Sequence, residues 1–184
     1  GNGKGFINGF IHLKIPDIAG VMKSVIQPTD LLKPYIDKNY EIVKDCIAGF
    51  HIRRGQSAED SKKFAYHPFA SQKAVDAMIK EALRLDAPVY VLSDSVSTKE
   101  FFKSKVPKAV CLDIEIGFTA DEHSQKVKVD NEDLSTKINS FCEWFLLSKM
   151  PKIYMVTGGI NGQNVDETVE EGITSTFGYS AALY

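Results

Sequence analysis

Short apolar runs alternate with amphipathic stretches along most of the chain. The apolar runs show no strict polar alternation, which is typical of strands covered on both faces. The amphipathic stretches repeat their apolar positions every three or four residues, as helices do. The predicted strands are residues 46–52, 89–92, 109–116 and 152–156, and the predicted helices include 31–44, 71–85 and a segment around 138–145. Strands separated by helices at this rhythm predict an α/β fold with a doubly wound parallel sheet.

Local signals add detail to some of these elements. Ser97 and Glu100 have the spacing of a capping box, which predicts a short helix through Phe101 and Phe102. Around residues 138–145 the apolar face is predicted from a set at helical spacing, namely Ile138, Phe141, Cys142 and Phe145. The polar stretch 119–133 is expected to be a surface loop.

Composition leaves this picture unchanged but excludes several classes of protein. The chain has 184 residues, of which 43% are hydrophobic and 25% are charged, as in ordinary globular domains and unlike disordered or fibrous chains. Three dispersed cysteines, Cys46, Cys111 and Cys142, sit in apolar runs and are expected to be buried and reduced. The histidines show no metal-ligand spacing, so no metal site is predicted.

Charge narrows the range of partners. A formal net charge of −2 gives no overall attraction to nucleic acid or to anionic membranes, so any anion must be held by a local cluster. No apolar stretch is long enough for a membrane span, and no signal-peptide region or Asn-x-Ser/Thr sequon occurs. We therefore expect a cytoplasmic protein, or one of the Golgi lumen if the chain is an excised domain.

The end of the first predicted strand carries the densest candidate chemistry. His51 is followed by Arg53 and Arg54, and then by Gln56. Ligands of open α/β sheets collect at the carboxyl ends of the strands. Two arginines there would offer planar donor forks suited to phosphate oxygens. The alternative is a pair of exposed arginines in surface salt bridges.

Two further segments offer polar groups at comparable places. Asp94 follows the second predicted strand, where its carboxylate could accept from ribose hydroxyls or a base amide, or could cap the next helix. Ser175, Thr176 and Phe177 belong to a hydroxyl-rich turn whose free backbone amides suit a phosphate, or which simply caps a helix.

Three motifs in order resemble those of one enzyme superfamily. His51 to Gly55 resembles the His-x-Arg-Arg signature of GDP-fucose-dependent fucosyltransferases of the α(1,2), α(1,6) and protein-O-fucosylating groups. Glu143 to Lys149 resembles the acidic-x-x-Leu-Leu-Ser helix of that superfamily. Ser175 to Ala182 resembles its third motif, in wording closest to the plant xyloglucan fucosyltransferases. The resemblance covers about residues 47–184.

The resemblance implies a fold and a reaction. The fold is a Rossmann-like doubly wound parallel sheet like the C-terminal half of a GT-B glycosyltransferase. Residues 46–184 would then be the nucleotide-sugar-binding domain, and residues 1–45 an N-terminal extension or the remnant of a first domain. The reaction would transfer fucose from GDP-fucose to a glycan or glycoconjugate acceptor with inversion. It would need no cofactor and no bound metal.

The family's roles can be carried over to matching positions. Arg53 would contact the β-phosphate and stabilise charge on the departing nucleotide, with Arg54 in support. His51 and Asp94 would lie near the ribose or the guanine, and residues 175–177 would close over the pyrophosphate and base.

One position departs from the family pattern. Gln56 stands where the family often has Asp, and an amide can hydrogen-bond but cannot orient an arginine by charge or act as a base. The chain is also short for two domains of ordinary size. Two alternatives therefore stay open: a nucleotide-sugar-binding domain without catalysis, and an unrelated α/β enzyme that acts on a phosphorylated ligand.

Overall fold

The computed structural model describes residues 18–53, 70, 72–114, 134–155, 157–158, 173–174, 180–182 and 184. In this part of the chain, four parallel strands form one sheet in the order β3-β2-β1-β4, interleaved with helices. The strands are β1 (Ala48–Ile52), β2 (Val89–Ser93), β3 (Ala109–Val110) and β4 (Ile153–Met155). The predicted parallel α/β architecture is confirmed, and it is Rossmann-like.

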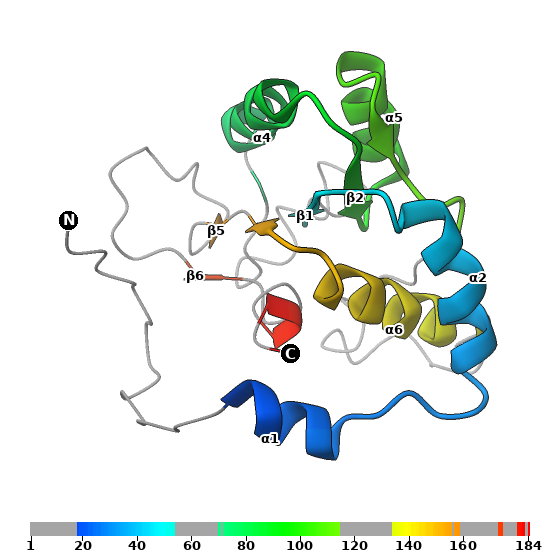
Figure 1. Cartoon of the computed structure of the whole chain (residues 1–184). Coiled ribbons are helices and arrows are strands. Elements are labelled where there is room, and N and C mark those ends of the chain that lie inside the picture. The colour runs from blue at the N-terminus through cyan, green and yellow to red at the C-terminus, as the bar shows by residue number, and fades with distance from the viewer. Residues whose placement is uncertain are drawn as a thin grey trace, which may run out of the picture.

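The helices of the described residues are α1 (Ile18–Val25), α2 (Lys33–Val43), α4 (Gln72–Leu85), α5 (Val96–Lys105) and α6 (Leu134–Ser148). A separate antiparallel pair joins β5 (Thr157–Gly158) to β6 (Ile173–Thr174). In Figure 1, α4 and α5 lie above the sheet, and α2 and α6 lie below it.

The strand order contains one reversal, which determines where a ligand would be expected. From β1 the chain moves outward through β2 to β3, and then returns to place β4 on the other side of β1. His51 accordingly pairs with Leu92 of β2 on one side and with Met155 of β4 on the other. A reversal of this kind leaves a crevice at the carboxyl ends of the two diverging strands.

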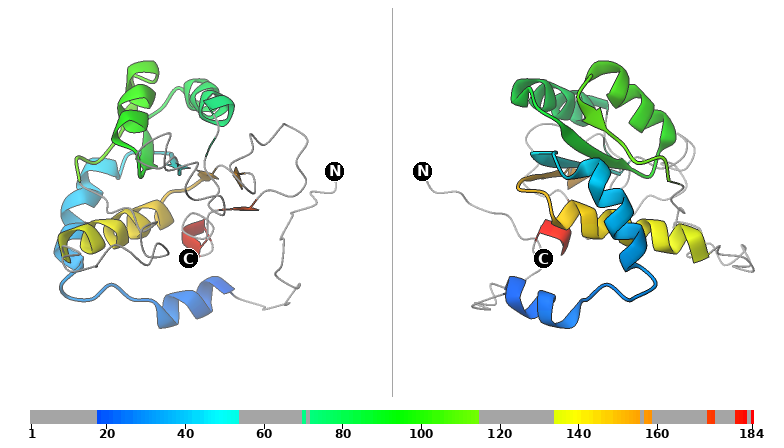
Figure 2. Two further views of the ribbon diagram at one scale, coloured as in Figure 1. Left: turned by 180° about the vertical axis from the view of Figure 1, so that it is seen from behind. Right: turned by 45° about the vertical axis from the view of Figure 1, so that its right-hand side comes forward.

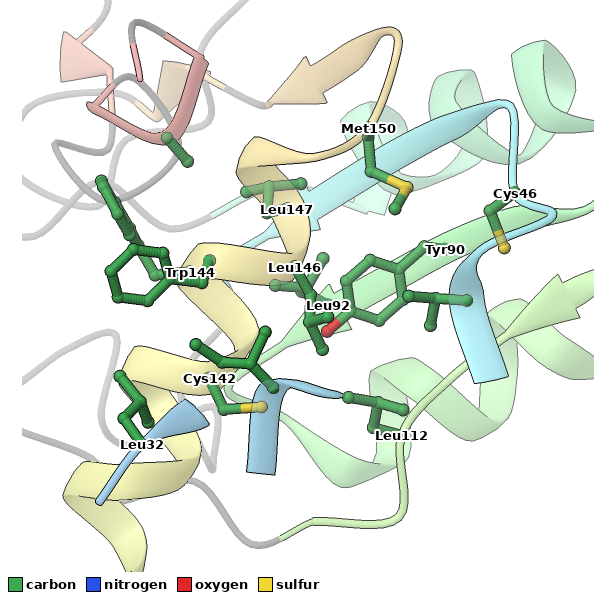
Figure 3. Packing of buried hydrophobic residues seen from close by; sticks show 14 of the residues in the cluster. Leu32, Cys46, Tyr90, Leu92, Leu112, Cys142, Trp144, Leu146, Leu147 and Met150 are labelled. Carbon is green, nitrogen blue, oxygen red and sulfur yellow. The ribbon is translucent and has the colours of Figure 1, made fainter. Parts of the chain in front are cut away.

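Two hydrophobic clusters cover the two faces of the sheet. Because side chains alternate along a strand, Phe50 and Val91 join the cluster on the side of α4 and α5. Tyr90 and Leu92 point the other way, into the cluster with α2 and α6. The view from behind and the view turned by 45° show the same layers (Figure 2). Figure 3 shows Tyr90 packed beside Leu146 and Met150. Burial on both faces explains the uninterrupted apolar runs of the strands.

Gly49 allows α6 to lie close against β1. A Cβ atom at this position would come within 2.6 Å of Leu147 Cδ1 and 2.9 Å of Met150 Cγ. Both distances are shorter than van der Waals contact, so any larger residue would require Leu147 and Met150 to shift.

The structure corrects three sequence expectations. The N-cap of α5 is Ser95, two residues before the predicted Ser97, because Ser95 has the extended backbone that a cap needs and accepts from the Thr98 amide. In the run predicted as a strand over 109–116, only Ala109–Val110 pairs among the described residues 109–114. Leu112, beyond the paired residues, is still buried in the core.

The third correction concerns α6. Phe141 was expected on its buried face but is 60% exposed, whereas the rest of that set is buried. The helix buries a continuous run from Cys142 to Leu147, and this orientation turns Phe141 outward.

The three cysteines are free thiols, as expected. Cys46 and Cys142 are buried and Cys111 is half-buried. Burial raises the pKa of each to about 11, so all three are protonated and unreactive at neutral pH.

Candidate functional site

Two of the predicted site residues leave the sheet side by side. Ile52, the last residue of β1, pairs with Ser93, the last residue of β2. The next residues along the two chains are Arg53 and Asp94. The parallel register therefore brings a guanidinium-bearing and a carboxylate-bearing residue to the same carboxyl edge of the sheet, next to the reversal between β1 and β4.

Arg53 is positioned by its own backbone as well as by the end of β1. Its carbonyl accepts a hydrogen bond from the amide of Ala70 at 2.7 Å. This contact ties the residue to the chain just before α4. The Arg53 side chain is half-buried, and its charge acts on His51. Two of its sequence neighbours in the predicted site, Arg54 and Gln56, lie outside the described residues.

His51 lies on the α6 side of β1. The strand's alternation places it on the same side as Gly49, which faces Leu147 and Met150 of α6. Burial, assisted by the nearby Arg53 charge, lowers the His51 pKa to about 4. The imidazole is therefore neutral at physiological pH and is a weak base that can donate or accept one hydrogen bond.

Asp94 does not cap the helix that follows it, so the capping alternative is wrong. The cap of α5 is Ser95, whose hydroxyl accepts from the Thr98 amide at 3.3 Å and from the Thr98 hydroxyl at 3.0 Å. The Ser95 amide in turn donates to the Ser93 hydroxyl. This network fixes the turn between β2 and α5, and thereby the place of Asp94 at the edge.

The third predicted segment stays untested. Ser175, Thr176 and Phe177 lie outside the described residues. The structure places β6 just before them and the short helical turn of residues 180–182 just after. Ser180 accepts a hydrogen bond from the Trp144 indole at 2.9 Å, which ties this end of the chain to α6.

From the sequence, Glu143 was noted only as the acidic position of the second motif, whereas the structure places it in a buried polar cluster with Lys99 and Tyr90. Glu143 of α6 is 2% exposed, and its Oε1 atom lies 4.0 Å from the Lys99 ammonium of α5. Neither Glu143 Oε1 nor the buried Tyr90 hydroxyl has a hydrogen-bond partner. The sequence signal that could have indicated this buried carboxyl group was one acidic residue within the apolar run Cys142 to Leu147.

In the described part of the chain, no cluster of three or more His, Cys, Asp or Glu side chains could hold a metal ion. No helix there is both long and apolar enough to cross a membrane.

Comparison of the chain with protein-family models, with curated proteins and with solved structures gave no match. The function is therefore inferred from the geometry of the carboxyl edge of the sheet and from the three sequence motifs.

Proposed function

We propose that the chain is the nucleotide-sugar-binding part of a fucosyltransferase-type glycosyltransferase. In this proposal it binds GDP-fucose, and the fucosyl group passes to a glycan or glycoconjugate acceptor with inversion. The observation that best supports it is that Arg53 and Asp94 directly follow Ile52 and Ser93, which pair at the carboxyl edge of a Rossmann-like sheet. Arg53 belongs to the His-x-Arg-Arg motif, and the two other motifs follow it in the expected order.

The edge provides chemistry suited to a nucleoside diphosphate. The Arg53 guanidinium would donate to the β-phosphate oxygens and stabilise the negative charge that grows there as the bond to the anomeric carbon breaks. The acceptor oxygen would attack that carbon from the opposite face, and its proton would leave to a base or to solvent. Asp94 would accept from a ribose hydroxyl or from a base amide.

The remaining motif residues would complete the site. The neutral His51 would supply one hydrogen bond beside the nucleotide without adding positive charge. Arg54 would support Arg53, and Gln56 would hydrogen-bond to the donor. Ser175, Thr176 and Phe177 would close over the pyrophosphate and base.

A second candidate is a nucleotide-sugar-binding domain without catalysis. Two observations favour it: Gln56 has no ionisable group where the family often has Asp, and His51 is a weak base. Incubation with GDP-fucose and a glycan array separates the two candidates. Transfer of fucose, or hydrolysis of the donor, would exclude the pure binding domain.

Calorimetric titration of the chain with GDP, GDP-fucose and UDP tests the proposal. We expect the two guanine nucleotides to bind and UDP to bind much more weakly. Equal binding of all three, or binding of none, would contradict the proposal. The remaining alternative would then be an unrelated α/β enzyme that acts on another phosphorylated ligand.

A further inference from the structure

The buried cluster beneath the carboxyl edge joins three elements. Glu143 comes from α6, Lys99 from the first turns of α5, and Tyr90 from β2. The side chains of Glu143 and Lys99 are only 2% and 11% exposed. A carboxyl group and an ammonium group are therefore enclosed together between α5 and α6.

Lys99 compensates Glu143 only in part. The Lys99 ammonium donates to the Leu112 carbonyl at 3.4 Å, while its distance of 4.0 Å from Glu143 Oε1 is too long for a hydrogen bond. Its backbone is also fixed, because the Lys99 amide donates to the Ser95 carbonyl. Desolvation of a buried carboxylate costs a large free energy when one of its oxygens, here Oε1, has no hydrogen-bond partner, and one distant ammonium does not fully offset that cost.

Several charged and titratable groups surround Glu143. Lys99 belongs to α5, Asp94 and Tyr90 to β2 and the turn after it, Cys111 to the segment after β3, and Cys142 to α6 itself. Burial raises the pKa of Glu143 to about 8; Lys99 opposes this rise, and the Asp94 charge adds to it. The cysteines and Tyr90 stay neutral in this range because burial raises their own pKa values.

We propose that Glu143 is an internal proton-binding site of this fold and that its protonation is coupled to the charge at Asp94. The carboxyl takes up a proton from solvent as the pH falls through the neutral range, and it becomes a neutral acid able to donate one hydrogen bond. Negative charge at Asp94 favours the protonated form, and Lys99 favours the ionised form.

The coupling is reciprocal, since any group that changes the charge at the edge changes the proton affinity of Glu143, and the reverse. A diphosphate bound beside Asp94 would add negative charge and would drive proton uptake at Glu143. That consequence rests on the proposed function, whereas the coupling itself requires no ligand.

Carboxyl NMR of the full chain labelled with ¹³C-glutamate tests the inference without any nucleotide. We expect one glutamate to titrate well above the others, and its signal to be missing in Glu143→Gln. The Asp94→Asn variant should lower that titration midpoint, and Lys99→Met should raise it. The control Asp76→Asn removes a carboxylate from α4, on the opposite face of the sheet, and should leave the midpoint unchanged.

Two results would overturn the inference: titration of every glutamate near the ordinary value of 4.5, or equal midpoints in wild type and Asp94→Asn. If Lys99→Met fails to fold, the Asp94→Asn variant still tests the inference through the titration midpoint of Glu143, because Asp94 is only half-buried. Because the measurement uses ligand-free protein, its failure leaves the nucleotide proposal standing, and the calorimetric titration can fail independently.

Discussion

At the scale of a single residue, Gly49 allows Leu147 and Met150 to pack close against β1. A methyl group there would collide with Leu147 and Met150, which both belong to the core. Gly49→Ala should therefore lower the free energy of unfolding by about 1–3 kcal/mol, the usual cost of overpacking. Urea denaturation measures this loss. The same change at Gly20 in α1 should not destabilise, since alanine favours a helix, and an equal loss in both variants would contradict the account.

The pH dependence of stability is a second property set by single residues. The pKa of His51 falls from 6.5 to about 4 on folding, so its contribution is complete above pH 6.5 and is lost as the pH falls toward 4. The pKa of Glu143 rises from 4.5 to about 8, so its contribution is complete below pH 4.5 and is lost as the pH rises toward 8. Of these two effects, only that of Glu143 acts between pH 6.5 and 8.

Glu143→Gln should therefore remove the decline in stability between pH 6.5 and 8. Urea unfolding at a series of pH values measures the slope in wild type and variant. Glutamine keeps the size of the side chain but has no proton to gain, so the variant's curve should be flat there. A wild type that is already flat in this window, or a variant that keeps the decline, would count against a raised Glu143 pKa.

At the scale of elements, the start of α5 depends on Ser95. Loss of its hydroxyl leaves the Thr98 amide without this acceptor, and removal of an N-cap costs about 0.5–2 kcal/mol. Ser95→Ala should reduce stability by that amount in thermal or urea unfolding. Ser104→Ala is the matched control near the other end of α5, where the exposed hydroxyl only donates to the Phe101 carbonyl. Equal losses would refute a specific capping role.

The sequence predicted which helices and strands form more accurately than the residues at which they begin and end. The periodicity that defines α4 and the apolar runs of β1 and β2 survive in the structure, because burial on one or two faces produces those patterns directly. Ser95 was missed because Ser97, unlike Ser95, has a glutamate three residues later. Phe141 was misplaced because helical spacing cannot tell which of several apolar faces meets the sheet.

At the scale of the whole molecule, the order of the strands determines where the candidate site lies. The order β3-β2-β1-β4 places the reversal beside β1, so the His-x-Arg-Arg motif ends at the one edge where a Rossmann-like sheet opens a crevice. The sequence predicted Arg53 and Asp94 at strand ends, but only the register shows that they follow two paired residues, Ile52 and Ser93. Glu143 and Lys99, 44 positions apart along the chain, meet through packing that no local pattern encodes.

The charge distribution of the molecule leads to a variant test. With a net charge of −2, anion binding must depend on local arginines. Arg53→Ala should weaken GDP binding by at least about tenfold, because a hydrogen bond to a charged group contributes about 1.5–3 kcal/mol. Arg84→Ala, on α4 and paired with Glu81, removes the same charge elsewhere and should leave affinity unchanged in calorimetry. Matching effects of the two variants would refute the site.

A crystal structure of the chain with GDP would show directly whether the proposed nucleotide site exists. We expect the diphosphate within hydrogen-bonding distance of the Arg53 guanidinium, at the carboxyl ends of β1 and β4, with the ribose or guanine beside Asp94. GDP bound at another edge or face, without contact to Arg53, would contradict it.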